Sequence, residues 1–181
     1  IEIGCNDGDM LRHFADVPHI GFDPAAGPAT AAMERGLNIS PFAFGLNTAQ
    51  LVTVTPGVII ANHVLAHVED VSDFLAGVAK LMDGNTVTFI EVQYLPDLLV
   101  NNAFDLVYHE HRNFFSLNSL EAAVAHHGST PTARPRVAPS TATRSCRARS
   151  AVGCSIQPGR GATRVSRSSQ ANAAPARWVR E

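Results

Sequence analysis

The chain has 181 residues, the size of one domain, with 45% hydrophobic residues and a formal net charge of -2. No run of about 18 apolar residues is present, so the sequence predicts no membrane-spanning segment and no membrane partner. Three scattered cysteines exclude a disulfide scaffold and a zinc module, and no secretory signal is visible, so a cytoplasmic location is expected.

Strands and helices alternate between residues 1 and 128. The expected strands cover 1–3, 19–22, 58–61 and 86–92, and the expected helices cover 9–15, 29–35, 71–82 and 117–127. Apolar runs such as 58–61 are typical of buried parallel strands. The pattern predicts an α/β fold, with a parallel sheet and helices on both of its faces.

The two ends of this segment carry further signals. The chain opens inside an apolar strand and lacks an initiator Met, so we expect its natural N-terminus to precede Ile1. Ser119 is the predicted N-cap of the last helix, and Gly128 is predicted to end it.

After Gly128 the composition changes. Ten of the 14 basic residues, all of them Arg, lie in 129–181, which holds only one of the 16 acidic residues. Large apolar residues are isolated there and follow neither a helical nor a strand period. We expect either a disordered basic arm or the product of a reading-frame slip, and the slip is favoured because no linker precedes the change. Nucleic-acid binding by such an arm would be non-specific, and it is not expected.

A glycine-rich turn follows the first expected strand. Glu2, Gly4 and Gly8 give the spacing Glu-x-Gly-x-x-x-Gly, with Asn6 between the glycines. A strand, a Gly-rich turn and a helix bring backbone N–H groups to a nucleotide-like ligand. Asp23 ends the next strand, where a carboxylate can accept hydrogen bonds from both ribose hydroxyls. Together these features predict a site for S-adenosylmethionine (SAM); the alternative is an ordinary strand-to-helix turn with a solvated Asp.

Four later segments carry a more specific pattern. They are Ala-Asn-His-Val-Leu-Ala-His-Val at 61–68, Glu-Val-Gln-Tyr-Leu at 91–95, Phe-Asp-Leu-Val-Tyr-His-Glu-His at 104–111 and Phe-Phe-Ser-Leu at 114–117. Together they resemble the sugar C-methyltransferase family, which methylates deoxysugars carried on nucleotide diphosphates. Tyr-His-Glu-His at 108–111 is the most specific part of the resemblance, which covers residues 1–128.

The resemblance implies a Rossmann-like class I methyltransferase sheet, SAM as the cofactor, and a nucleotide-diphosphate deoxysugar as the substrate. It adds Asn62 to the expected cofactor-binding residues Glu2, Gly4, Asn6, Gly8 and Asp23. Members of the family carry a zinc-binding domain before the SAM domain and a further domain after it. Neither is visible in this sequence, so the SAM domain is assigned to residues 1–128 and the aberrant tail to 129–181.

The resemblance also implies methyl transfer to a carbon beside the ketone of the sugar. A base must remove a proton from that carbon, and the resulting enolate attacks the methyl group. Histidine suits this role because its unperturbed pKa, about 6.5, is close to working pH. By resemblance His111 is the base, and Tyr108, Glu110 and His67 orient it or hydrogen-bond the keto oxygen.

Other interpretations of these residues remain open. A small-molecule O- or N-methyltransferase on the same fold needs no strong base, and a catalytically inactive fragment would at most bind SAM. His63 and His67 are spaced to share one helical face, and with His109 and His111 they would form a metal site. No metal is expected, because the motif lacks the Glu of His-Glu-x-x-His. Residues 108–111 are otherwise a polar loop without a role.

Overall fold

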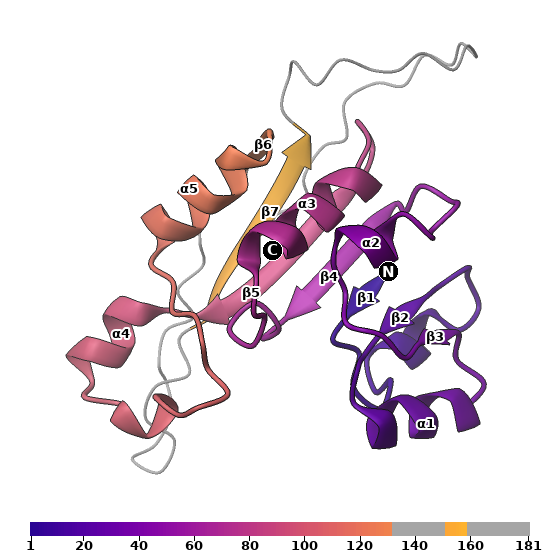
Figure 1. The fold of residues 1–181 in the computed structure, drawn as a ribbon, viewed down its shortest axis with the longest axis horizontal. Coiled ribbons are helices and arrows are strands. Elements are labelled where there is room, and N and C mark those ends of the chain that lie inside the picture. Colours follow the sequence, from indigo (N-terminus) through magenta and orange to yellow (C-terminus); the bar gives the residue numbers. More distant parts are fainter. Residues whose placement is uncertain (132–150, 159–181) are drawn as a thin grey trace.

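The computed structural model describes residues 1–131 and 151–158, which form one twisted seven-stranded sheet with helices packed against it (Figure 1). The strand order is β3-β2-β1-β4-β5-β7-β6. The strands are β1 (Glu2–Ile3), β2 (Gly21–Phe22), β3 (Ile39–Ser40), β4 (Val58–Asn62), β5 (Val87–Gln93), β6 (Ser129–Pro131) and β7 (Ala151–Pro158). The first five pair in parallel, and β7 runs antiparallel to β5 and to β6.

The helices connect the parallel strands and extend the chain beyond β5. They are η1 (Leu11–Phe14), α1 (Ala26–Glu34), α2 (Leu46–Ala49), α3 (Val71–Leu81), α4 (Leu95–Val100), η2 (Phe104–Leu106) and α5 (Leu117–His126), where η marks a 3-10 helix. No helix in the described part of the chain is long and apolar enough to cross a membrane.

Alternation along the buried strands places a core on each face of the sheet. Ile3 and Ile59 are buried with α3, which contributes Phe74 among others to the larger hydrophobic cluster. Neighbouring strand residues point to the opposite face, where Leu11 of η1 and Ala32 of α1 form a second cluster. The predicted α/β fold with helices on both faces is confirmed.

Two predictions about helices need correction. Ser116, not Ser119, is the N-cap of α5: its hydroxyl accepts a hydrogen bond from the Ser119 amide at 3.2 Å, and the Ser119 hydroxyl accepts one from the Ser116 amide at 2.9 Å. This is a capping box, in which the N3 residue also bonds to the cap. The expected helix 9–15 is a short 3-10 helix, Leu11–Phe14, because the turn before it extends through Met10.

Two segments after Gly128 form strands, although the sequence shows no strand period there. Ser129–Pro131 forms β6 and Ala151–Pro158 forms β7, which pairs with β5 from Thr88↔Ile156 to Gln93↔Ala151. Strand pairing uses backbone groups, so a segment without a hydrophobic period can still complete a sheet. Ile156 of β7, which pairs with Thr88, has a buried side chain that is 1% exposed. The rest of the predicted tail, residues 132–150 and 159–181, lies outside the described residues.

Candidate functional site

The glycine-rich turn lies at the carboxyl end of β1. Gly4, Asn6 and Gly8 all have a left-handed backbone, with φ of 70°, 50° and 77°. Glycine and asparagine adopt this conformation most readily. A Cβ atom at Gly4 would collide with the side chain of Val64, and one at Gly8 with that of Leu37. The turn therefore needs glycine at both positions for its conformation and for its packing.

Asp23 holds this turn in place from the end of β2. Its Oδ2 accepts a hydrogen bond from the backbone N–H of Asn6 at 2.7 Å, and its Oδ1 accepts one from the backbone N–H of Ala25 at 2.9 Å. The residue is only 8% exposed, although each carboxylate oxygen can accept more than one hydrogen bond. The arrangement leaves acceptor capacity beside the turn, which fits the two hydroxyls of a ribose.

Glu2 is buried in β1, below the turn, at 7% exposure. Its Oε2 has no hydrogen-bond partner among the described residues. Burial raises the pKa of this carboxyl to about 7; the nearby Asp23 adds to the rise, while the N-terminal ammonium and the Leu11 N–H oppose it.

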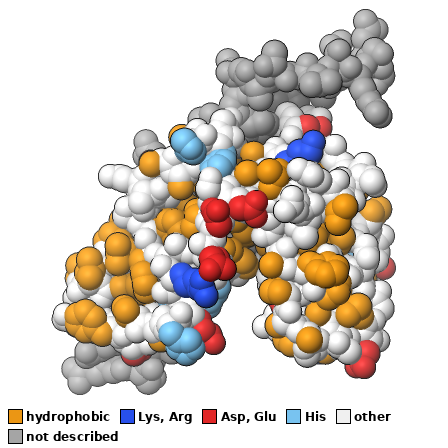
Figure 2. Space-filling view, in the orientation of Figure 1, with side chains coloured by type: hydrophobic (Ala, Val, Ile, Leu, Met, Phe, Trp, Pro, Cys, Tyr) orange, Lys and Arg blue, Asp and Glu red, His pale blue; other side chains and the backbone are white. Residues whose placement is uncertain are grey.

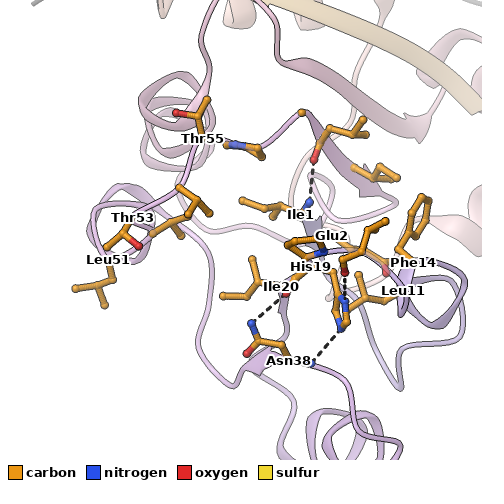
Figure 3. Close-up of a pocket in the computed structure, with 18 residues that line it drawn as sticks. Ile1, Glu2, Leu11, Phe14, His19, Ile20, Asn38, Leu51, Thr53 and Thr55 are labelled. Carbon is orange, nitrogen blue, oxygen red and sulfur yellow. Dashed lines mark hydrogen bonds between the residues drawn. The ribbon is translucent and has the colours of Figure 1, made fainter. Parts of the chain in front are cut away.

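Glu2 also borders a cavity of about 840 Å³ at the amino ends of the strands (Figure 3). The cavity is lined by Leu11, Phe14 and His19 on one side and by residues 51–58 on the other. It lies at the opposite end of β1 and β4 from the glycine-rich turn. In open parallel α/β sheets ligands bind at the carboxyl ends of the strands, so the cavity is not the expected cofactor site.

Asn62 is the last residue of β4. The loop that follows it runs between the glycine-rich turn and a second polar cluster around His111. The Asn62 amide donates a hydrogen bond to the sulfur of Met10 at 3.7 Å, which places it over the segment that follows the glycine-rich turn. His63 has a left-handed backbone, with φ of 55°, and its Nε2 lies 2.9 Å from Oε1 of Glu91 on β5. The structure thus pairs His63 with a carboxylate and not with His67.

His111 is the buried residue of a second polar cluster, at 7% exposure. Its Nε2 lies 3.1 Å from the Tyr108 hydroxyl and 3.4 Å from the amide nitrogen of Gln93. Its Nδ1 lies 2.8 Å from the Leu106 carbonyl oxygen. The ring of His67 packs beside it, with ring centroids 4.8 Å apart.

These contacts define the tautomer of the neutral His111 ring. The Leu106 carbonyl can only accept a hydrogen bond, so Nδ1 carries the ring proton and donates a hydrogen bond to it. Nε2 then carries no proton, and its lone pair accepts hydrogen bonds from the Tyr108 hydroxyl and the Gln93 amide. An imidazole held in this state is a proton acceptor at Nε2.

Glu110 is the one predicted catalytic residue whose side chain does not join this cluster. Its carboxylate is 62% exposed and lies 4.0 Å from His109, which is itself 90% exposed. Only the backbone of Glu110 contributes, since its carbonyl accepts a hydrogen bond from Nδ1 of His67 at 3.1 Å. Residues 108–111 form a turn, with the His111 amide bonded to the Tyr108 carbonyl, so consecutive side chains point in different directions.

The sequence analysis missed Gln93 and Asn113. Asn113 fastens the loop of the second cluster to the loop after β4: its amide donates to the carbonyl oxygens of Leu65 at 3.3 Å and Val68 at 2.7 Å. The backbone amides of Arg112 and Asn113 both bond to the Ala66 carbonyl. Gln93 could have been suspected from its place, because it ends a buried strand at the edge where Asn62 ends another.

One continuous set of contacts joins the two clusters. The loop after β4 touches the glycine-rich turn through Val64 and the His111 ring through His67. Figure 2 shows a notch at the lower edge of the molecule, between the part that carries α1 and the part that carries α4. In Figure 1 the strand arrows of β4 and β5 point toward this edge. No three His, Cys, Asp or Glu side chains within the described ranges are grouped as metal ligands.

Sequence comparison with known proteins shows the family of the chain. A family described as "Methyltransferase domain" matches residues 1–133. The chain belongs to this methyltransferase family. A C-methyltransferase, NovU of Streptomyces niveus, is 35% identical over 133 residues, which are 71% of this chain and 32% of that protein. The chain therefore spans about a third of the length of this relative.

Solved structures share the fold at low sequence identity. The YcgJ protein of Bacillus subtilis has a TM-score of 0.64 at 15% identity, covering 88% of this chain and 91% of that one. A SAM-dependent methyltransferase of Clostridium acetobutylicum has a TM-score of 0.66 at 8% identity, over 87% and 82% of the two chains. Magnesium protoporphyrin IX methyltransferase of Synechocystis, with bound SAH (S-adenosylhomocysteine), has a TM-score of 0.63 at 16% identity, over 87% and 73%. The Rossmann-like class I methyltransferase fold and SAM as the cofactor are confirmed.

The first prediction concerns Asp23. Asp23→Asn removes the charge but keeps the shape, and a hydrogen bond to a charged group contributes about 1.5–3 kcal/mol. We expect the affinity for S-adenosylhomocysteine, measured by titration calorimetry, to fall by about 10- to 100-fold. Asp16→Asn, an exposed carboxylate elsewhere on the chain, should leave the affinity unchanged. Equal affinities for the two variants would exclude Asp23 from the cofactor site.

The second prediction concerns Glu2 and pH. The raised pKa keeps this carboxyl protonated in the folded chain up to about pH 7, whereas the unfolded chain ionises it near the ordinary glutamate pKa of 4.5. The unfolded state therefore binds fewer protons across this window, and the stability of the parent falls as pH rises. Glu2→Gln should match the parent near pH 4 and exceed it by up to about 3 kcal/mol at pH 8, in urea unfolding. A pH-independent difference would contradict the raised pKa.

Proposed function

We propose that this methyltransferase transfers a methyl group from SAM to a carbon beside the ketone of a nucleotide-linked deoxysugar. The observation that carries the proposal is the buried His111 imidazole, whose Nδ1 bonds to the Leu106 carbonyl and whose Nε2 therefore carries no proton in the neutral ring. The 35% identity to a C-methyltransferase supports transfer to carbon. Methyl transfer to oxygen or nitrogen also releases a proton but ionises no carbon–hydrogen bond, so the methylated atom of the product separates these alternatives.

Each side chain of the second cluster has a separate role in proton removal. Nε2 of His111 takes the proton from the substrate carbon, and the electron pair of the C–H bond moves into an enolate. The resulting imidazolium keeps its Nδ1–H bond to the Leu106 carbonyl, which stabilises the charged ring. The Tyr108 hydroxyl, 3.1 Å from Nε2 in the free chain, would release that nitrogen when substrate binds and turn its single hydrogen to the keto oxygen as it gains charge. His67 packs against the base and limits its movement.

The first cluster would hold the cofactor beside this base. Asp23 would accept hydrogen bonds from the ribose, and the turn from Gly4 to Gly8 would lie along the methionine part. Asn62 would close the site from the end of β4. When bound, SAM supplies an electron-poor methyl group as the electrophile. We expect the remaining parts of a longer protein of this family to supply contacts to the nucleotide of the substrate.

The test replaces the base and compares it with its neighbour. His111→Asn should lower kcat with a 4-keto-6-deoxy sugar nucleotide by about 100-fold or more, the range of general base catalysis. Its affinity for S-adenosylhomocysteine in calorimetry should stay within about twofold of the parent, because the ring lies outside the cofactor turn. His109→Asn, the exposed neighbour two positions away, should keep full activity.

Three outcomes would contradict the proposal. Full activity of His111→Asn, or a product methylated on oxygen or nitrogen, would favour the alternative methyltransferase. Failure of the parent chain to bind the cofactor at millimolar concentration would favour a fragment without activity.

A further inference from the structure

We propose that Gln93 positions the His111 imidazole and follows its protonation state by reversing its side-chain amide. The proposal rests on the proposed function, in which His111 is the base. Gln93 contacts the base and not the reacting carbon, so it is a positioning residue.

The position of Gln93 in the sheet suits this role. It is the last residue of β5, which pairs with β4 on one side and with β7 on the other. At Gln93 itself the pairing partner is Ala151 of β7. The strand is therefore a fixed platform, whereas the base stands on the loop between η2 and α5. A half-buried side chain from this platform places a polar group 3.4 Å from Nε2 of the base.

The ring is thereby held at both nitrogens by groups from different segments. The Leu106 carbonyl accepts from Nδ1, and Tyr108 and Gln93 both reach Nε2. Tyr108 lies on the same loop as the base and moves with it. Gln93 is the side chain that ties Nε2 to the sheet.

An amide is suited to both states of the ring. It carries two N–H donors and a carbonyl acceptor. When the ring is neutral, Nε2 needs a donor, and the amide nitrogen of Gln93 provides it. When Nε2 has taken a proton it becomes a donor, and rotation of the amide by half a turn presents Oε1 as the acceptor. A carboxylate in the same place can only accept, and an aliphatic side chain can do neither.

The experiment measures the titration of the His111 imidazole by NMR in the 181-residue chain, so it needs no substrate. The resonance is assigned by its absence in His111→Asn. The titratable groups packed against the ring are Tyr108 and His67, and both are retained. Gln93→Glu adds a carboxylate beside Nε2, and Gln50→Glu at the C-cap of α2 makes the same change elsewhere as a control.

An opposite charge within about 4–6 Å favours the protonated ring. We therefore expect Gln93→Glu to move the titration midpoint of His111 upward by about 1 pH unit or more, and Gln50→Glu to leave it in place. Equal midpoints for the two variants would overturn the proposal, because Gln93 would then not contact the base. A midpoint raised only by Gln93→Glu supports it.

Kinetics separate this proposal from the proposed function. A base must be neutral to act, so the acidic limb of the kcat/KM profile of Gln93→Glu should move upward with the NMR midpoint. Gln93→Leu should lower kcat about tenfold at unchanged KM, because the ring loses its tie to the sheet. An unchanged kcat for Gln93→Leu would overturn the positioning role. A raised NMR midpoint with an unmoved pH profile supports the contact and contradicts His111 as the base.

Discussion

The parallel pairing of β1 with β2 and β4, and of β4 with β5, is the constraint on which the rest of the structure depends. Parallel strands end at one edge of the sheet, so residues far apart in sequence come together there. Glycines after β1, a carboxylate after β2, and amides at the ends of β4 and β5 all lie along this edge. An antiparallel arrangement of the same segments would scatter them over both edges.

The loop after β4 converts this edge into one site. Its first residues pack on the glycine-rich turn, and its last residues hold the loop that carries His111 through the Ala66 carbonyl and Asn113. The glycine-rich turn and the loop that carries His111 are thus attached to one short segment, which fixes how they lie relative to each other. Catalysis of methyl transfer depends on such alignment because the reacting atoms must approach in line.

The sequence predicted the parts of the molecule that local chemistry determines. Gly4 and Gly8 were predictable because only a few residues tolerate a left-handed backbone, and 58–61 because a buried parallel strand must be apolar on both faces. The strands β6 and β7 were missed because pairing along β5 requires backbone groups and little side-chain pattern. Ser119 was assigned as a cap because cap chemistry is shared by Ser116, one turn earlier.

Within the candidate site, residue types were easier to predict than directions. Tyr108, Glu110 and His111 are adjacent in sequence, yet the turn at 108–111 sends the Glu110 carboxylate toward solvent and His111 inward. Gln93 was missed because its signal is its place at the end of a buried strand and not its residue type. Its role depends on which ring nitrogen it reaches, and this is a property of the folded chain alone.

We propose that the cofactor binds at the carboxyl edge of the sheet and not in the cavity at its amino edge. Titration of S-adenosylhomocysteine into the ¹⁵N-labelled chain, followed by amide NMR shifts, tests this directly. We expect the largest shifts at the backbone amides of Gly4, Asn6, Gly8 and Asn62. The backbone amides beside the cavity, those of Thr53, Thr55 and Gly57, should not shift. Shifts concentrated at the cavity, with the glycine-rich turn unmoved, would contradict it.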